Sequence, residues 1–151
     1  RKMRREAAEA LEKLFAGAEG AGHQMKMRTG FRSYSYQASL FSSYASKNGE
    51  EAANKYSARA GQSEHQTGLC CDVSSPSVSW ALSYNYGNTD EGKWLAAHAH
   101  EYGFIIRYLE GKEEITGYVY EPWHIRYVGV DAAKEIYEKG MCLEEYLGIT
   151  N

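Results

Sequence analysis

Two short segments of this chain, SEHQTGLCCD at 63–72 and EPWHIRYVG at 121–129, combine histidines and carboxylates with strand-forming residues. Together they supply the parts of a catalytic metal site. Such a site keeps three protein ligands, leaves a fourth position for water, and needs a nearby carboxylate as base. A fold that uses both segments must bring them to one point. The expected metal ligands are His65, Asp72 and His124, and the expected base is Glu121.

The types of donor atom indicate a catalytic rather than a structural site. Two neutral imidazoles and one carboxylate leave a bound zinc ion with net positive charge, so it can polarise a carbonyl group and acidify water. A site made entirely of thiolates would be closed, and the cysteines here lack zinc-finger spacing. We therefore expect one open Zn²⁺ site per chain.

The spacing of these residues is weak evidence when taken alone. A Glu-x-x-His pair arises easily by chance in a chain with this many glutamates. The His-x6-Asp spacing also occurs at His124 and Asp131, where the aspartate suits the start of a helix. The functional interpretation must therefore rest on the full residue pattern of each motif and not on the spacing alone.

The residue pattern of the two motifs, SEHQTGLCCD and EPWHIRYVG, resembles the signature of VanY-like D-alanyl-D-alanine carboxypeptidases. These are zinc peptidases that trim bacterial cell-wall peptides. The resemblance covers most of the chain from about Gly22 onward. Besides the two metal motifs it includes the segments TGFRSYSYQ at 29–37, EGKWLAAHAHEYGFIIRY at 91–108, ITGYVYEPWHIRYVG at 115–129 and LEEYLG at 143–148.

The resemblance implies roles for residues around the metal. It assigns the zinc ligands to His65, Asp72 and His124 and the catalytic base to Glu121. These are the same four residues that the types of donor atom indicate.

The resemblance also implies substrate contacts. Arg32 and Gln37 match an Arg-Ser-x-x-x-Gln segment whose arginine faces the substrate and stabilises charge on the attacked carbonyl, and Ser63 matches a substrate-contacting position. Two residues depart from the family pattern. Cys70 stands where the family often has a small residue such as alanine, and Ala60 where it often has proline.

Three functions are compatible with this site. The first is a D,D-carboxypeptidase that releases the terminal D-alanine of pentapeptide stems in peptidoglycan. The second is an L,D-carboxypeptidase that acts on tetrapeptide stems with the same metal chemistry. The third is a non-catalytic, zinc-stabilised module that binds the cell wall. The presence of Glu121 and Arg32 argues against the third function, because binding alone needs no general base.

Size and charge limit what surrounds the site. With 151 residues and a mass of 17.0 kDa, the chain fits one domain, which we expect to span 1–151 and to act as a monomer. The net charge of −3 offers no basic stripe for nucleic acid. The 13 tyrosines suit a cleft whose side chains must be both apolar and hydrogen-bonding.

The sequence contains no apolar run long enough to span a membrane and no signal peptide. It starts with RKMRR and lacks an initiator methionine. A cell-wall enzyme must be exported, so we expect a signal or membrane anchor to precede residue 1 and the protein to work outside the cell or facing the wall. A basic start exposed to solvent is the plainer interpretation of RKMRR.

The three cysteines are expected to be small buried hydrophobic residues. Neighbouring residues on a strand point to opposite faces, so Cys70 and Cys71 cannot readily bond to each other, and Cys71 turns away from Asp72. A disulfide between Cys142 and one of this pair remains an alternative.

The pattern of apolar residues predicts an α+β fold with a small antiparallel sheet that carries the zinc site, flanked by N-terminal, central and C-terminal helices. An amphipathic helix within 1–21 carries Ala7, Leu11, Leu14 and Ala18. Further helices are expected over 36–47, 50–58 and 90–102 and from 131 to 140, with a turn at LEEYL, and strands over 25–28, 69–73, 104–108 and 118–127.

Two local features complete the expectations. The Ser-, Gly- and Asn-rich segment 74–89 reads as a long loop whose Trp80, Tyr84 and Tyr86 either line the substrate cleft or pack under the loop. Residues three apart on a regular strand face opposite sides, yet Glu121 and His124 must both face the same metal ion. We therefore expect Glu121 just before the strand, with a turn at the following proline.

Overall fold

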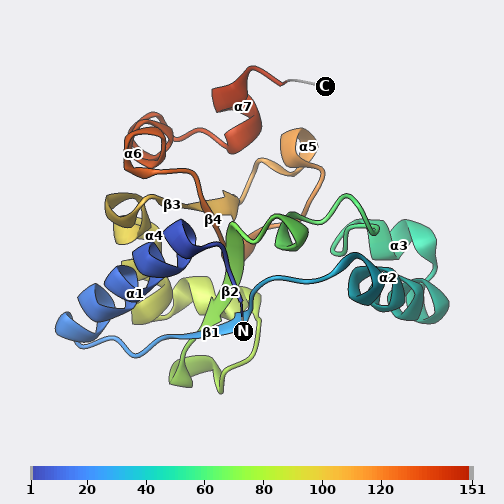
Figure 1. Cartoon of the computed structure of the whole chain (residues 1–151), viewed down its shortest axis with the longest axis horizontal. Coiled ribbons are helices and arrows are strands. Elements are labelled where there is room, and N and C mark those ends of the chain that lie inside the picture. Colours follow the sequence, from blue (N-terminus) through green and yellow to red (C-terminus); the bar gives the residue numbers. More distant parts are fainter. Residues whose placement is uncertain (1, 150–151) are drawn as a thin grey trace.

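A four-stranded antiparallel sheet lies at the centre of the protein, as shown by a computed structural model that describes residues 2–149 (Figure 1). Residue 1 of the basic start, and residues 150–151 of the expected domain, lie outside the described part. The predicted α+β class is confirmed. The strands follow the spatial order β1 (Lys26–Thr29), β2 (Cys70–Ser74), β4 (Glu121–Tyr127) and β3 (Phe104–Tyr108).

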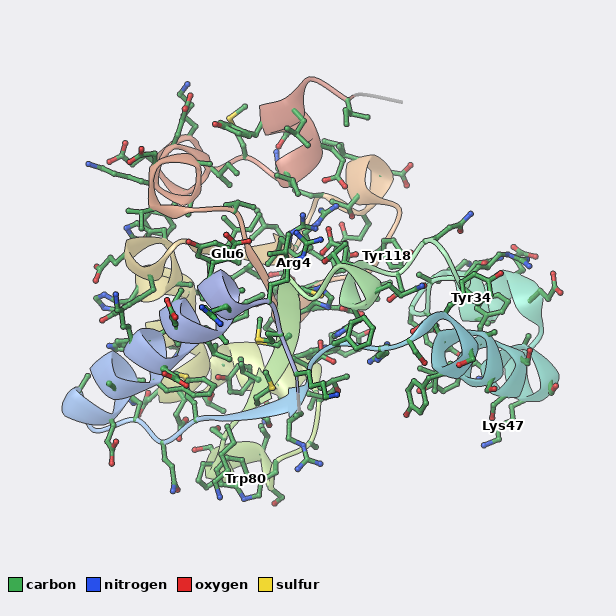
Figure 2. The ribbon with its side chains drawn as sticks, in the orientation of Figure 1. Arg4, Glu6, Tyr34, Lys47, Trp80 and Tyr118 are labelled. Atoms are coloured by element: carbon green, nitrogen blue, oxygen red, sulfur yellow. The ribbon has the colours of Figure 1, made fainter. Side chains whose placement is uncertain are left out.

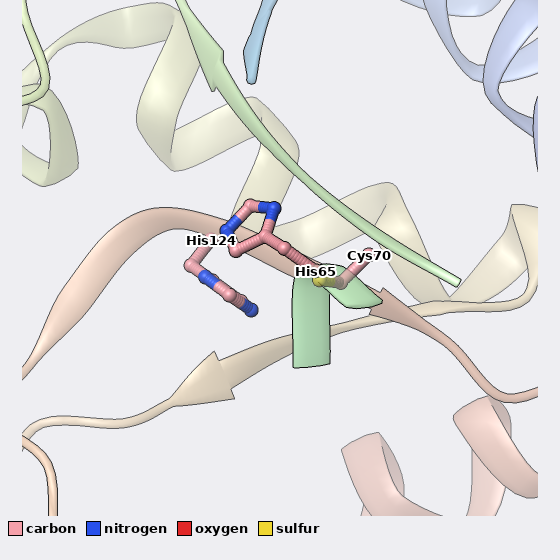
Figure 3. Close-up of side chains that lie close together, drawn as sticks. All are labelled: His65, Cys70 and His124. Atoms are coloured by element: carbon pink, nitrogen blue, oxygen red, sulfur yellow. The ribbon is translucent and has the colours of Figure 1, made fainter. Parts of the chain in front are cut away.

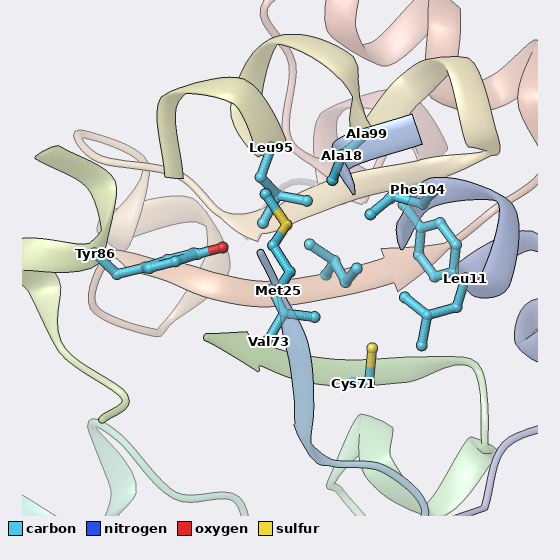
Figure 4. Close-up of a cluster of buried hydrophobic side chains, with 11 residues drawn as sticks. Leu11, Ala18, Met25, Cys71, Val73, Tyr86, Leu95, Ala99 and Phe104 are labelled. Atoms are coloured by element: carbon cyan, nitrogen blue, oxygen red, sulfur yellow. The ribbon is translucent and has the colours of Figure 1, made fainter. Parts of the chain in front are cut away.

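One face of the sheet packs against helices α1 (Arg5–Gly20) and α4 (Asp90–His98). The apolar spacing of α1 buries one stripe of this helix, as the sequence predicted. In the resulting core, Leu11 and Leu95 meet Val73 of β2, Ile125 of β4 and Phe104 of β3 (Figure 4). Cys71 also belongs to this core, so its predicted orientation away from Asp72 is confirmed.

The opposite face of the sheet carries the candidate site. Side chains alternate along a strand, so Cys70 and Asp72 point away from the core that contains Cys71. On this face Ile105 of β3 packs against helix α6 (Val130–Lys139). The sheet therefore carries the main apolar core on one face, and the polar candidate site with a smaller apolar cluster on the other.

Helices α2 (Tyr34–Asn48) and α3 (Glu50–Asn54) form a lobe beside the sheet (Figure 1). Ser33 begins α2 as an N-cap, because its side-chain oxygen accepts a hydrogen bond from the backbone nitrogen of Tyr36 at 3.2 Å. The α3 helix is shorter than the 50–58 helix expected from the sequence. The lobe supplies tyrosines to one wall of the site described below.

Several connections contain helical turns that the sequence did not predict. The expected loop 74–89 includes the 3₁₀ turns η2 (Pro76–Val78) and η3 (Tyr84–Asn88). The expected helix 90–102 divides into α4 and the 3₁₀ turn η4 (Ala99–Tyr102). A short helix, α5 (Glu113–Thr116), lies between β3 and β4. The helix α7 (Leu143–Leu147) follows α6, and it coincides with the turn that the sequence predicted at LEEYL.

Strand β4 contains an irregularity beside the site. Ile106 of β3 pairs with Ile125, and Tyr108 pairs with Glu121, so a step of two residues on β3 faces a step of four on β4. Such a bulge rotates the chain locally. The expectation that Glu121 precedes the strand is therefore wrong, because Glu121 is the first residue of β4 and the chain rotates within the strand.

The cysteines and helices give two further results. All three cysteines are free and buried, so the alternative disulfide from Cys142 is not formed.

None of the helices within residues 2–149 combines the length and the apolar character needed to cross a bilayer.

Candidate metal centre and active site

His65 is held by the 3₁₀ turn η1 (Glu64–Thr67), which ends at Gly68 with a left-handed φ of 71°. The Nδ1 atom of His65 lies 2.9 Å from the carbonyl oxygen of Gly30. Because a carbonyl oxygen can only accept, Nδ1 carries the proton in this contact. The lone pair of Nε2 is then left facing Asp72, whose Oδ2 lies 3.5 Å away.

His124 faces the same aspartate from the neighbouring strand. Asp72 and His124 are direct partners in the β2–β4 pairing, so their side chains share one face. The Nδ1 atom of His124 lies 3.2 Å from Oδ1 of Asp72 and 3.5 Å from Oε2 of Glu121. The rings of His65 and His124 are perpendicular, with centroids 5.0 Å apart. The four predicted side chains therefore converge, and each of them is buried.

Cys70 joins this cluster, which the sequence interpretation missed. Ligand atoms of His65, Cys70 and His124 all lie within 4.8 Å of one another (Figure 3). The expectation that Cys70 is simply a small buried hydrophobic residue is therefore incomplete. The signal was present in the sequence, since Cys70 lies two residues before Asp72 and so shares its face of the strand.

The charges around the two imidazoles favour a cation at this point. Burial alone would lower the pKa of His65, but hydrogen bonds with Asp72 and Cys70 raise it to about 9. Burial opposes the charged form of His124 too, yet the same two partners raise its pKa well above the usual value. The pKa of Asp72 is lowered despite burial, because both imidazoles hydrogen-bond to it when they are protonated. A divalent metal ion fits this donor set of imidazole nitrogens with a carboxylate or a thiolate.

Glu121 has the properties of a general base. Burial raises its pKa to about 7, and the nearby charge of Asp72 acts in the same direction. A carboxylate whose pKa lies near neutrality can accept and return a proton at physiological pH. Glu121 also lines the cavity described below, so a substrate can reach it.

Arg32 is fixed beside the metal cluster. Its backbone nitrogen donates to the carbonyl oxygen of His65 at 3.1 Å, and its Nη2 lies 3.5 Å from Oδ2 of Asp72. Its Nη1 donates to Oε1 of Gln37 at 3.3 Å, while Nε2 of Gln37 donates to the Ala58 carbonyl at 2.6 Å. Gln37 is fully buried and does not line the cavity. It therefore positions Arg32, and the expected substrate contact by Gln37 is not supported.

A cavity of about 290 Å³ opens over the cluster. Arg32, Ser63 and Glu121 reach it, and aromatic side chains form much of its wall. This wall combines apolar rings with phenolic hydroxyl groups, which suits a peptide substrate. The aromatic residues are Tyr44 and Tyr56 from the lobe, together with Tyr84, Tyr108, Tyr118 and Trp123.

The three aromatic residues predicted from segment 74–89 have different positions. Tyr84 lines the cavity, as expected. Tyr86 is fully buried in the apolar core, and Trp80 lies under Lys26, whose Nζ is 4.5 Å from the ring centroid. Figure 2 shows Trp80 well away from Tyr118 of the cavity wall. The expectation that Trp80 and Tyr86 line the cleft is therefore wrong.

Comparison with known proteins places this geometry in a family. The model of the D-alanyl-D-alanine carboxypeptidase family VanY matches residues 1–130. The chain belongs to this family. A D-alanyl-D-alanine carboxypeptidase of Enterococcus faecalis (strain ATCC 700802 / V583) is 36% identical over 146 residues, which cover 91% of this chain and 52% of that protein. The chain thus spans about half the length of the curated relatives it matches.

Two solved structures share the fold over nearly the whole chain. The LD-carboxypeptidase LdcB superposes with a TM-score of 0.93 at 46% identity, covering 99% of this chain and 70% of that one. A mutant of the vancomycin-resistance D,D-pentapeptidase VanY, in complex with Zn(II), has a TM-score of 0.85 at 34% identity, covering 96% of this chain and 83% of that one.

Proposed function

We propose that this protein is a zinc-dependent carboxypeptidase that releases the terminal D-alanine from peptidoglycan stem peptides, and that it acts outside the cell membrane. The observation that carries the proposal is that Glu121, Arg32 and the two histidines open onto the same cavity. The Zn(II) complex of a related VanY supports zinc as the metal.

We assign the metal ligands to His65 through Nε2, His124 through Nδ1, and Asp72. These two nitrogens face the two carboxylate oxygens of Asp72 at 3.5 and 3.2 Å. Each histidine turns its other nitrogen toward an oxygen acceptor, as metal-bound histidines commonly do. Cys70 is the alternative third ligand, because its sulfur belongs to the same cluster.

The protein side chains then divide the reaction between them. A bound zinc ion would polarise the scissile carbonyl group and acidify the attacking water. Glu121 accepts the proton of that water and returns it to the amine nitrogen of the departing D-alanine. The guanidinium group of Arg32 donates hydrogen bonds to the oxygen on which negative charge develops. Ser63 lines the cavity, and we assign it a contact with the peptide.

The specificity for the stem peptide is a separate question. The sequence interpretation placed D,D-carboxypeptidase activity first and L,D-carboxypeptidase activity second. LdcB, an LD-carboxypeptidase, is 46% identical with a TM-score of 0.93, whereas the D,D-pentapeptidase VanY is 34% identical with a TM-score of 0.85. This greater similarity favours L,D activity, so we propose the tetrapeptide stem as the preferred substrate and keep the pentapeptide stem as the second candidate.

An assay with both stem peptides tests the proposal. The zinc-loaded protein is incubated separately with tetrapeptide and pentapeptide stems, and free D-alanine is measured by mass spectrometry. We expect faster release from the tetrapeptide, by about tenfold or more. Both stems end in D-alanine but differ in the configuration of the residue before it, and a pocket shaped for one configuration rejects the other. Faster release from the pentapeptide would establish D,D activity instead. Binding of either peptide without any release would indicate the non-catalytic module.

Replacing Arg32 by alanine is expected to lower kcat/KM by about 10²–10³-fold, the usual effect of removing one donor to a developing oxyanion. Zinc content should remain at the wild-type level, because the arginine is not a ligand. Arg28→Ala is the matched control, since Arg28 is exposed on β1 and does not line the cavity. Equal activity of the two variants would remove Arg32 from the catalytic machinery.

A further inference from the structure

A chain of charged side chains links His124 to the C-terminal helix α7. It begins at Glu64, the residue before the proposed ligand His65. Oε2 of Glu64 lies 3.4 Å from Nε2 of His124, on the side of the ring that faces away from Asp72. Oε1 of Glu64 accepts hydrogen bonds from Nε of Arg107 at 2.7 Å and from Nη1 of Arg126 at 2.9 Å. The arginines thus occupy one carboxylate oxygen and leave the other for His124.

The second half of this chain starts at Arg107 on β3. The two terminal nitrogens of its guanidinium group donate to both oxygens of Glu144, which belongs to α7. Arg107 is only 8% exposed, so its charge needs such partners. Two guanidinium groups and two carboxylates balance to zero net charge.

We propose that Glu64 and Glu144 are positioning residues for the metal centre. This inference rests on the proposed function, because it takes His124 as a zinc ligand. Glu64 accepts the proton on Nε2 of His124, which selects the tautomer with a free lone pair on Nδ1 and fixes the plane of the ring. Glu144 holds Arg107 by a two-point contact, so that Arg107 uses its remaining Nε–H on Glu64.

Loss of Glu144 has a specific structural consequence. The two terminal nitrogens of Arg107 would be left without acceptors in a buried setting. A planar guanidinium group readily forms a two-point contact with a single carboxylate. Arg107 would then turn toward both oxygens of Glu64 and draw Oε2 away from His124.

The link also reaches past residue 130, where the match to the family model ends, into the LEEYLG segment. The family model ends at residue 130, whereas Glu144 lies in α7 (Leu143–Leu147). The C-terminal helix thus contributes to the site without touching the cavity.

The neighbouring residue Glu145 provides a matched control. It lies on the same helix and has a similar ion pair, with Lys112 at 2.8 Å, but that pair does not lead to the metal centre. The other oxygen of Glu145 accepts a hydrogen bond from the backbone nitrogen of Cys142 at 2.7 Å, and a glutamine can keep this capping contact. Glu144→Gln and Glu145→Gln therefore both remove one charge from α7. Only the first weakens the link, because a glutamine offers Arg107 one acceptor oxygen instead of two.

The experiment measures zinc affinity by competition with a chromophoric chelator, and coordination geometry from the visible absorption of the Co(II)-loaded protein. Glu64→Gln should weaken zinc binding by about 10–100-fold, as loss of the carboxylate partner of a metal-bound histidine does. Glu144→Gln should weaken it in the same direction by about tenfold or less. Both should change the Co(II) spectrum, whereas Glu145→Gln should match the wild type in affinity and spectrum.

Two results would overturn the inference. The first is wild-type zinc affinity in Glu144→Gln and Glu64→Gln. The second is an equal effect of Glu144→Gln and Glu145→Gln, which would indicate a general role of α7 in stability. If Glu64→Gln does not fold, the Glu144 and Glu145 pair decides alone. A wild-type protein that binds no zinc would overturn the proposed function itself, whereas a zinc-binding wild type with unchanged variants overturns the positioning role alone.

Discussion

Glu121→Gln is expected to keep its zinc and to lose about 10²–10⁴-fold in kcat, the usual contribution of a general base. The reason is that an amide has the shape of the carboxylate but cannot accept a proton from water. Oε2 of Glu121 lies 3.5 Å from Nδ1 of His124, close enough to serve a water at the metal position. The measurements are D-alanine release under saturating stem peptide and zinc content by elemental analysis.

Glu101→Gln is the control for this variant, because Glu101 is exposed and lies outside the cavity. It should retain wild-type turnover. Retained turnover in zinc-loaded Glu121→Gln would remove Glu121 from the role of base. Loss of zinc in this variant would instead make Glu121 part of the ligand set.

His124→Ala is expected to lose both zinc and activity. Zinc sites with four protein ligands bind with about 10–16 kcal/mol, so each ligand contributes about 2.5–4 kcal/mol, which corresponds to about 60-fold or more in affinity. The control is His98→Ala, whose imidazole is exposed and pairs with Glu101. Zinc content after gel filtration, together with thermal melting to establish that both variants are folded, provides the measurement. Full zinc stoichiometry in folded His124→Ala would contradict the ligand assignment.

A pair of variants on β2 decides the identity of the third ligand. Asp72→Ala should lose zinc by a similar factor, whereas Cys70→Ala should retain it, because the two free histidine nitrogens face the oxygens of Asp72. The pair is well matched, since both side chains come from the same face of one strand. The reverse outcome would make the Cys70 thiolate the ligand and leave Asp72 as a neighbouring charge.

Local patterns in the sequence predicted most of the elements that carry the site. The stripe of Ala7, Leu11, Leu14 and Ala18 fixes α1, because a helix buries residues at this spacing whatever the rest of the fold. Alternation along β2 correctly sent Cys71 into the core. The residue pattern of the two metal motifs predicted that four polar side chains converge, and the structure brings these four side chains together.

Contacts between distant segments could not be predicted in this way. Glu64 meets Arg107, which is 43 residues away in the sequence, and Arg107 meets Glu144, a further 37 residues along the chain. The periodic pattern of residues within one helix or strand does not indicate which distant residue will pair with it. Tyr86 was misplaced for a similar reason, because its serine- and asparagine-rich surroundings indicate a surface loop, while a short 3₁₀ turn directs its ring into the core.

The surplus of residues in β4 makes the active site sensitive to the backbone geometry of one strand. In a regular strand Glu121 and His124 would project to opposite sides, and the proton acceptor would be sequestered among apolar side chains. The step of four residues against two lets both face the metal cluster. Straightening the bulge without changing a residue would separate base from ligand even if every chemical group were preserved. The backbone geometry of this segment therefore matters to the chemistry as much as the identity of its residues.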